Sequence, residues 1–344
     1  MLVTAQPVLR RFWYPTMRID ELQAGPQPFT LLGEDIVLWL DADGRPAAAI
    51  DQCAHRFARL SRGGTTSGNV QCPYHGWQYD RDGHCVAVPQ APDHTIPRSY
   101  RVKAFHCEER YGYAWVCLGD PLEPIPHIAE AEDLAFRAMH MEREVFQCSS
   151  LAGIDNFFDN SHHHFVHGST FGDPNDASPM VIDSLEETPS GIVFRFTIRN
   201  YGQTFRDQAE SLSKQEPTLL VRELTWFLPF TVRVRIRFPS GAHSISLVTY
   251  TPLSDTTCQF VCVLLRDDTE DDVPAASAVA EIAAIVREDK AILECVDPDV
   301  PLNLAAQQHM AGDRAGMLMR RKLQDLLDQH GEEEVTRHQH REVR

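Results

Sequence analysis

The chain has 344 residues, of which 43% are apolar, and its 32 lysines and arginines against 49 aspartates and glutamates give a net charge of −17. This acidic balance disfavours nucleic acid and anionic membranes as partners. No run approaches the ~18 apolar residues of a membrane span and the first residues lack a secretory signal, so we expect a cytoplasmic protein.

Residues 1–125 are expected to form a mainly β domain, because short stretches of strand length alternate with turn signals. The stretch 35–50 is typical of a hairpin, and 113–121 of a strand that ends in a turn. Pro124, Pro126 and a polar run then mark a boundary, and the length of the chain fits two domains.

The second domain, over 126–325, is expected to combine a helical stretch around 152–167, an antiparallel sheet and a helix over 273–296. The stretches expected in this sheet are apolar or alternating, and they cover 191–201, 224–238, 243–253 and 258–267. The remaining stretch, 326–344, is charged and lacks periodicity, so we expect a flexible tail.

Two short segments each pair a cysteine with a histidine: one residue separates Cys53 from His55, and two residues separate Cys72 from His75. Such a set could bind a structural zinc ion. Zinc sites usually pair like ligands, however, whereas a [2Fe-2S] cluster with one iron bound by cysteines and the other by histidines needs two matching loops of this kind. The remaining cysteines lack a ligand spacing and are expected to be reduced core thiols: Cys85, Cys107, Cys117, Cys148, Cys258, Cys262 and Cys295.

The two spacings and the context CPYHGW at 72–77 resemble the Rieske iron–sulfur proteins. Respiratory members of that family add a disulfide between the two loops, at positions that correspond to Ala58 and Tyr74 here. The chain is therefore more similar to the oxygenase branch. Trp77 either covers the cluster or is an ordinary core aromatic.

A second group of ligand-type residues lies in DNFFDNSHHHFVH, residues 155–167. Four histidines and two carboxylates in a partly apolar helix are costly to bury unless they bind a metal. Helix geometry favours His163 and His167, which are four residues apart. In Rieske oxygenases the iron motif is Asp, two residues, His, four residues, His, and this resemblance implies Asp159, His162 and His167 instead, with a helix that ends or distorts there.

The third iron ligand is expected to be a carboxylate, because ferrous oxygenase centres typically use two histidines and one carboxylate. Asp289 falls near the middle of an apolar face of the helix expected over 273–296, and the same residue corresponds to the family's third ligand. Glu288 lies outside this face and is the less favoured candidate. Without the family resemblance, Asp289 could instead pair with an arginine or cap a neighbouring element.

As a whole, the chain resembles the catalytic α subunit of a Rieske non-haem iron oxygenase, nearer to the shorter branch of vanillate and dicamba demethylases. The resemblance implies an α+β protein, with an antiparallel β Rieske [2Fe-2S] domain followed by a helix-grip catalytic domain that binds a mononuclear Fe(II). It also implies that Asp159, itself not a ligand, links a cluster histidine to His162 by hydrogen bonds, across the subunits of a homotrimer.

Hydroxylation or oxidative demethylation of a small aromatic or cyclic substrate is the expected reaction, as in aromatic catabolism. Arene cis-dihydroxylation is the alternative within the family, and a Rieske-type electron carrier is the alternative from another class. Electrons are expected from a separate NAD(P)H-dependent reductase, with or without a ferredoxin, since the sequence contains no GxGxxG flavin motif and no plant-type ferredoxin spacing.

The substrate pocket is expected beside the iron, with Asn156, Phe157 and Phe165 as candidates, although each phenylalanine could equally be plain core. Three arginines on one strand face could receive a substrate carboxylate, although a solvated face is favoured: Arg233, Arg235 and Arg237. The sequence leaves the identity of the substrate open.

Overall fold

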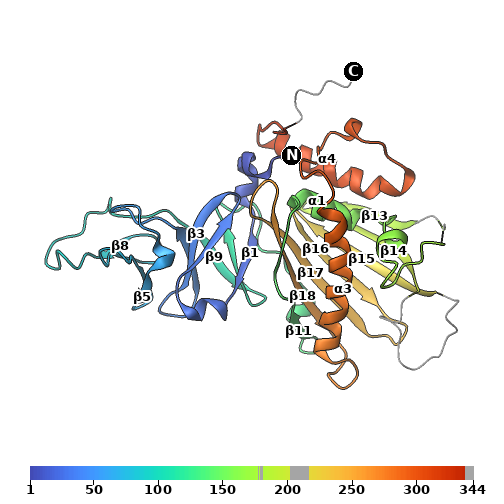
Figure 1. Cartoon of the computed structure of the whole chain (residues 1–344), viewed down its shortest axis with the longest axis horizontal. Helices are drawn as coiled ribbons and strands as arrows, with labels where there is room; N and C mark the ends of the chain where they lie inside the picture. Colours follow the sequence, from blue (N-terminus) through green and yellow to red (C-terminus); the bar gives the residue numbers. More distant parts are fainter. Residues whose placement is uncertain (177, 179–180, 202–216, 338–344) are drawn as a thin grey trace. The chain divides into compact units, whose positions relative to one another are not determined.

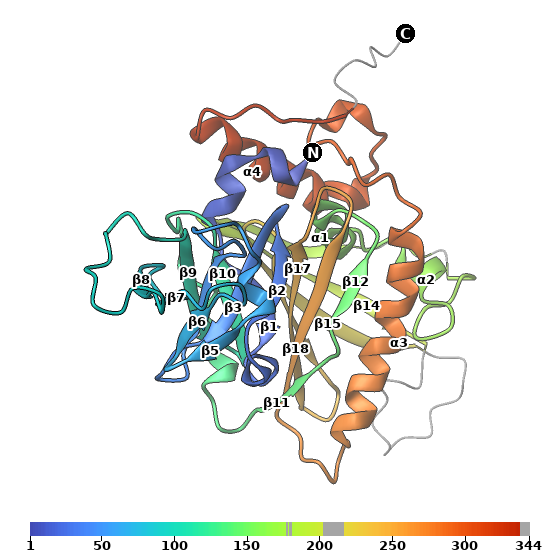
Figure 2. The same cartoon turned by 60° about the vertical axis from the view of Figure 1, so that its left-hand side comes forward.

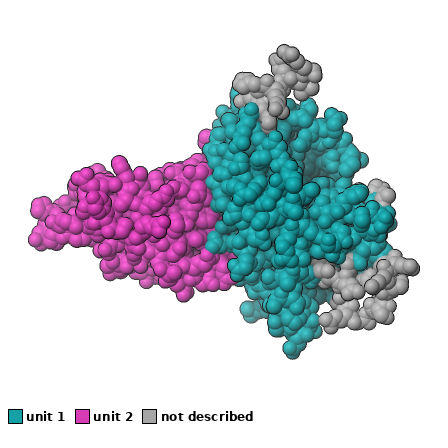
Figure 3. All heavy atoms as spheres, viewed as in Figure 1, with its two compact units in different colours: residues 1–6, 126–344 teal, residues 7–125 magenta. Residues whose placement is uncertain are grey.

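A computed structural model describes residues 1–176, 178, 181–201 and 217–337 of the chain, which folds into two units. One unit is Pro7–Ile125, and the other combines Met1–Gln6 with Pro126–Arg344 (Figure 3). The first six residues group with the second unit, although the sequence analysis assigned them to the first domain. They do so because the Met1 ammonium lies 2.8 Å from Asp299 Oδ1 and the Leu2 amide donates to the Val335 carbonyl.

The unit Pro7–Ile125 contains two antiparallel sheets. The larger has the strand order β1-β10-β9-β4-β3-β2, with bounds Tyr14–Arg18, Tyr113–Cys117, Ala104–Arg110, Pro46–Ile50, Glu34–Leu40 and Gln27–Leu31. The smaller has the order β5-β6-β7-β8, with bounds Gly64–Thr66, Asn69–Gln71, Gln78–Tyr79 and Cys85–Ala87.

The hairpin expected over 35–50 is formed by β3 and β4. Asp41 closes its turn, because its side chain accepts hydrogen bonds from the amides of Asp43 and Arg45 and its carbonyl accepts one from the amide of Gly44. Gly44 has φ of 75°, a left-handed conformation that favours glycine. The expectation of a mainly β first domain is confirmed.

The second unit is built on an eight-stranded antiparallel sheet with the order β11-β18-β17-β16-β15-β14-β13, and β12 also pairs with β18. The strand bounds, from β11 to β18, are Arg137–His140, Glu144–Phe146, Ile182–Thr188, Gly191–Asn200, Thr218–Phe227, Thr231–Arg237, His243–Pro252 and Cys258–Arg266. Burial alternates along β14 and β16, so one face of each strand packs inward.

Helices accompany this sheet: α1 (Ser150–Phe158), α2 (His163–Val166), α3 (Ala275–Leu293) and α4 (Arg314–Gln329). In Figures 1 and 2, α3 runs alongside the sheet, and both α1 and α2 contact α3. Sheet and helices together form the α+β catalytic unit that the sequence predicts. Within the described residues, no helix combines the length and the apolar composition needed to cross a bilayer.

The helical stretch expected over 152–167 is two helices. The Ser149 side chain accepts a hydrogen bond from the Ala152 amide and begins α1, which ends where Asp159 adopts an extended conformation. After α2, the His167 carbonyl accepts hydrogen bonds from the amides of Thr170, Phe171 and Gly172 at 2.7–3.0 Å. The break lets His162 and His167 face the same cavity.

The structure also differs from the expected flexible tail. Helix α4 continues to Gln329 with Leu326 and Leu327 buried. Beyond it, the amide of Arg337 donates to Asp299. Residues 338–344 lie outside the described residues.

Gly153 sets how closely α1 approaches the sheet. A Cβ atom at this position would lie 2.5 Å from the Tyr250 ring, and that ring is held by Phe146 and Phe260 at centroid distances of 5.9 and 5.5 Å. Gly153→Ala is therefore expected to lower the free energy of unfolding by about 1–3 kcal/mol, which thermal denaturation would measure as a fall in melting temperature of several degrees. Gly64→Ala, where a Cβ would meet nothing within 4 Å, is the control. An unchanged or raised melting temperature for Gly153→Ala would contradict this packing, since alanine alone favours a helix by about 1 kcal/mol.

Candidate metal centres and substrate cavity

Two loops of the first unit follow the same backbone path around Cys53 and Cys72. The amide of each cysteine donates to the carbonyl five residues later, and its carbonyl accepts from the amide four residues later, at 2.8–3.0 Å. The fourth residue is left-handed in both loops, with φ of 58° at Phe57 and 72° at Gly76. Because the two turns repeat each other, they present their side chains in equivalent ways.

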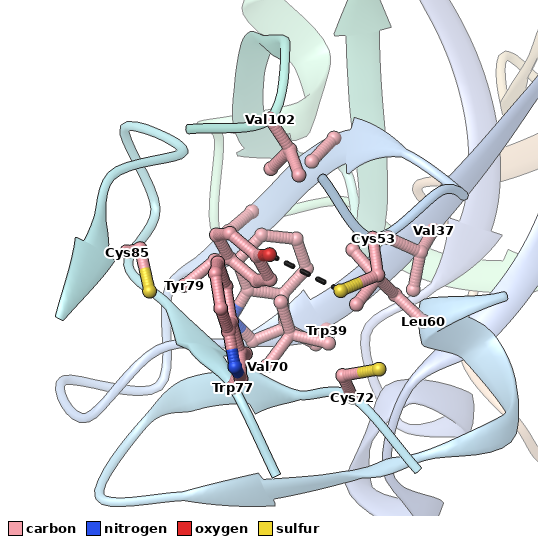
Figure 4. Close-up of a cluster of buried hydrophobic side chains, with 12 residues drawn as sticks. Val37, Trp39, Cys53, Leu60, Val70, Cys72, Trp77, Tyr79, Cys85 and Val102 are labelled. Carbon is pink, nitrogen blue, oxygen red and sulfur yellow. Dashed lines mark hydrogen bonds between the residues drawn. The ribbon is translucent and has the colours of Figure 1, made fainter. Parts of the chain in front are cut away.

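The cysteine and histidine side chains of these loops lie together. The thiols of Cys53 and Cys72 are buried inside the unit (Figure 4). His55 and His75 are half-buried, with ring centroids 4.6 Å apart. Two buried sulfurs and two outer imidazoles match the donor set of a [2Fe-2S] cluster whose irons are bound differently.

Two aromatic residues support this site. The Trp77 ring stacks on His55 at 4.6 Å and 3° and is buried, so it covers a predicted ligand and is also part of the core. The Tyr79 hydroxyl lies 3.1 Å from Cys53 Sγ (Figure 4). Hydrogen bonds to cluster sulfurs affect the reduction potential. Tyr79 could not be predicted from the sequence, because it belongs to no ligand spacing.

All nine cysteines lie within the described residues and are free thiols there. Eight of them are buried, but Cys295 is exposed, so the expectation of a core thiol is wrong there. It lies just beyond the C-terminal end of α3, where the expected apolar face continues into solvent.

A second donor set converges in the catalytic unit. Asp289 Oδ1 lies 3.5 Å from His162 Nε2 and 3.2 Å from His167 Nε2, and donor atoms of the three residues all lie within 4.8 Å of one another. Asp289 Oδ1 is buried and makes no hydrogen bond within the described part of the chain. Two imidazole nitrogens and one carboxylate oxygen therefore converge without forming hydrogen bonds to one another. This donor set fits a ferrous ion.

The charges of this set favour a cation between its members. Burial disfavours charge on both Asp289 and His162, but each stabilises the charge of the other. The pKa of Asp289 is therefore lowered to about 2, and the pKa of His162, which also faces Asp159, is raised to about 9. Among the described residues, no carboxylate pairs with His163 in this way, and burial together with nearby cations holds the pKa of His163 well below the usual range. The anionic carboxylate thus sits beside His162 and His167 rather than beside His163, the ligand that helix geometry alone favoured.

Glu288 lies on the opposite edge of the His167 ring from Asp289. Its Oε2 atom is 2.9 Å from His167 Nδ1 and accepts a hydrogen bond from Thr170 Oγ1 at 2.6 Å. Such a carboxylate fixes the tautomer of a ligating histidine and raises its basicity. From the sequence Glu288 is only a rival ligand, whereas in the structure it contacts the far edge of the His167 ring.

Asp159 lies beside His162, with Oδ2 3.6 Å from Nδ1. Its other oxygen accepts a hydrogen bond from the Ser161 amide at 2.8 Å. The side chain is nevertheless 48% exposed, so it can contact His162 on one side and a further group on the other.

The three converging side chains open into a cavity with an empty volume of about 780 Å³, which includes the open solvent at its mouth. Two of the three substrate-pocket candidates, Asn156 and Phe157, line it. Strand side chains form the opposite wall: Phe196, Arg222, Leu224, Val234, Ile236, Ser246, Val248, Tyr250 and Phe260. Ile282, Ile285 and Val286 of α3 complete it.

Other sequence candidates lie elsewhere. Phe165 is 75% exposed and does not line the cavity, because it lies on the outer side of the short helix α2. Arg233 is neither a cavity residue nor solvated, since it pairs with Glu130. Arg235 and Arg237 alternate with the cavity residues of β16, so they are on its other face.

Comparison with known proteins agrees with both centres. Residues 12–105 match the Rieske [2Fe-2S] domain, and residues 146–329 match the vanillate O-demethylase oxygenase C-terminal domain. Methylxanthine N1-demethylase NdmA of Pseudomonas putida is 30% identical over 334 residues, which cover 94% of this chain and 91% of the relative. This chain belongs to the Rieske non-haem iron oxygenases.

Two further comparisons agree with this assignment. The oxygenase component of dicamba O-demethylase from Stenotrophomonas maltophilia is 28% identical over 315 residues, 84% of this chain and 88% of the relative. The solved structure of NdmA with caffeine matches with a TM-score of 0.82 at 28% identity, over 94% of this chain and 92% of the other. The Rieske oxygenase is thus a redox enzyme whose family carries a [2Fe-2S] cluster and a mononuclear iron, and both donor sets are present in its fold.

Glu288→Gln in this Rieske oxygenase is expected to weaken retention of the mononuclear iron by about 10- to 100-fold, because the hydrogen bond that orients His167 loses its charge. Iron titration of the apoprotein, followed by iron analysis, measures the change. Glu294→Gln is the matched control, since Glu294 lies at the end of the same helix and accepts a hydrogen bond from the Gln147 amide, which a glutamine oxygen can still accept. Equal iron affinity in the two variants would contradict the supporting role.

Proposed function

We propose that this protein is a terminal monooxygenase that hydroxylates or oxidatively demethylates a small aromatic substrate. In the proposed assignment the first domain, 1–125, binds the cluster and the second, 126–325, binds the iron. The cluster ligands are Cys53, His55, Cys72 and His75, and the iron ligands are His162, His167 and Asp289. The observation that carries the proposal is the convergence of two Nε2 atoms and a buried carboxylate oxygen on a largely apolar cavity.

When bound, the cluster supplies single electrons and the ferrous ion supplies dioxygen activation. In the overall reaction one oxygen atom enters a C–H bond of the substrate, and the other is reduced to water with two electrons and two protons. Insertion into an N- or O-methyl group gives a product that releases formaldehyde. Apolar side chains such as Leu224, Val248 and Ile285 would hold the ring and limit water.

Demethylation is favoured within this class by the relatives, which are named as demethylases of methylxanthines and of dicamba. The dicamba relative is named as an oxygenase component, which supports a separate reductase, with or without a ferredoxin, as the source of electrons here. The cytoplasmic location expected from the sequence stays a prediction.

Asp159 is proposed to link the two centres of neighbouring subunits in a homotrimer. Its contact with His162 Nδ1 and its exposed outer half support this role, because a cluster histidine of another subunit could hydrogen-bond to the outer half. A monomeric active enzyme would contradict it.

The test is an anaerobic purification with iron and acid-labile sulfide analysis and low-temperature EPR after dithionite reduction. About three irons and two sulfides per chain, with a Rieske-type signal, are expected. Methoxy- and N-methyl-arenes are then offered with a surrogate reductase, and formaldehyde is measured. Two irons after ferrous reconstitution would overturn the mononuclear site, and diol products would overturn monooxygenation.

A further inference from the structure

Arg222 is a cation in the cavity of the catalytic unit that no part of the proposed reaction uses. It lies on β15 between Phe196 of β14 and Ile236 of β16 in the sheet register, and all three line the cavity. A charged side chain in such an apolar row is costly unless a partner compensates it. We therefore looked for the group that compensates the charge of Arg222.

Three other arginines of this sheet have a carboxylate partner within the chain. Arg195 pairs with Glu223, Arg233 with Glu130, and Arg266 with Asp268. Among the residues that the structure describes, Arg222 has no ion pair, and its buried Nε makes no hydrogen bond. Its guanidinium packs 5.1 Å from the centre of the Phe171 ring. Burial lowers the pKa of Arg222 to about 10, so the group still carries its charge at neutral pH.

Arg222 is the charge in the cavity that an incoming anion would compensate. Asp289 is the carboxylate whose charge reaches Arg222, but its Oδ1 faces His162 and His167. Glu288 and Asp159 lie beside the same two histidines, so those carboxylates would balance a divalent ion there, and Arg222 would still lack an ion-pair partner among the described residues. A carboxylate is a suitable partner, because a guanidinium can bind it through two parallel hydrogen bonds.

Arg222 and the predicted iron ligand His167 lie against the same aromatic ring. The Phe171 ring stacks on His167 with centroids 4.6 Å apart at 26°, and the Arg222 guanidinium lies 5.1 Å from its centre. Both residues also line the cavity, so a ligand bound there can contact both. Leu224 and Val234, on the same cavity wall, provide apolar surface for a bound ring.

We propose that Arg222 binds the carboxylate of an aromatic acid and so orients its ring in the cavity, with the group to be oxidised toward His162, His167 and Asp289. This rests on the proposed function, because it assigns the substrate class of the same site. Arg222 is then the residue that selects acids over neutral aromatics of the same shape.

The test compares matched acids and amides on the iron-loaded holoenzyme. Anaerobic titration calorimetry is run with 3- and 4-methoxybenzoate and with the corresponding methoxybenzamides, which have nearly the same shape but no charge. Wild type is expected to bind at least one acid about tenfold or more tightly than its amide. Arg222→Gln is expected to lose that preference while its affinity for the amide changes by less than about threefold. Arg222→Lys should keep part of the preference, since it retains the charge without the paired donors.

Arg195→Gln is the matched control, because it removes one positive charge from the opposite face of the same sheet. Equal binding of acids and amides by wild type, or no binding of any acid, would overturn the inference, as would a preference that persists in Arg222→Gln. If Arg222→Gln fails to fold, two measurements still test the inference: the ratio of acid to amide affinity in wild type, and the same ratio in Arg222→Lys. Acid binding without formaldehyde release would instead contradict the proposed reaction and leave the role of Arg222 intact.

Discussion

Asp289→Asn is expected to lower the iron content from about three to about two atoms per chain, with two sulfides and the Rieske EPR signal retained. The substitution keeps the shape of the side chain but removes the negative charge that Asp289 places between His162 and His167. Residues that merely support a ligand contribute about 10- to 100-fold in metal affinity, so loss of a charged ligand should exceed about 100-fold. Formaldehyde release should fall at least as far.

The control for Asp289→Asn is Glu281→Gln, on the same helix. Burial raises the pKa of Glu281 to about 8, so the side chain is mostly protonated at pH 7 and glutamine changes its charge little. Glu281→Gln should therefore keep three irons and normal turnover. If Asp289→Asn also kept its third iron after dialysis against a chelator, the carboxylate ligand would be misassigned, and Glu288 would be the next candidate.

The features that the sequence predicts best depend on spacing within one segment. The segments at 53–55 and 72–75 each place a cysteine and a histidine within a single turn, so the sequence pattern already contains the local geometry. Strand length and alternation similarly predicted most of the large sheet. Asp289 can be singled out from the sequence for a related reason, since a carboxylate in an apolar helix face requires a partner.

The features that were missed depend on contacts between segments. Glu288 and Asp289 are adjacent in sequence, and only the fold shows that they approach His167 from opposite edges of its ring. Arg222 cannot be singled out from the sequence, because its proposed role depends on the apolar residues that strand pairing places beside it. Phe165 was misplaced because the break after α1 reorients the side chains of α2.

Asp159→Asn is expected to leave both metal contents unchanged while product formation falls by about 100-fold. Asp159 contacts His162 but is not within the group of convergent donor atoms, so the iron should stay bound. Loss of its charge would weaken the hydrogen bonds proposed to connect His162 with a cluster histidine, and changes to supporting residues of this kind cost about 10- to 100-fold. The direct measurement is single turnover, in which reoxidation of the prereduced cluster by substrate and dioxygen is followed optically.

Asp173→Asn provides the matched control for this slow reoxidation, because Asp173 is a nearby loop carboxylate whose hydrogen bonds go only to Asn175 among the described residues. Its cluster should reoxidise at the wild-type rate. A fall in iron content in Asp159→Asn would instead make Asp159 part of the metal site itself. Normal reoxidation with low product would place its effect after electron transfer, at substrate positioning beside His162. Only slow reoxidation with full metal content fits a residue that links the two centres.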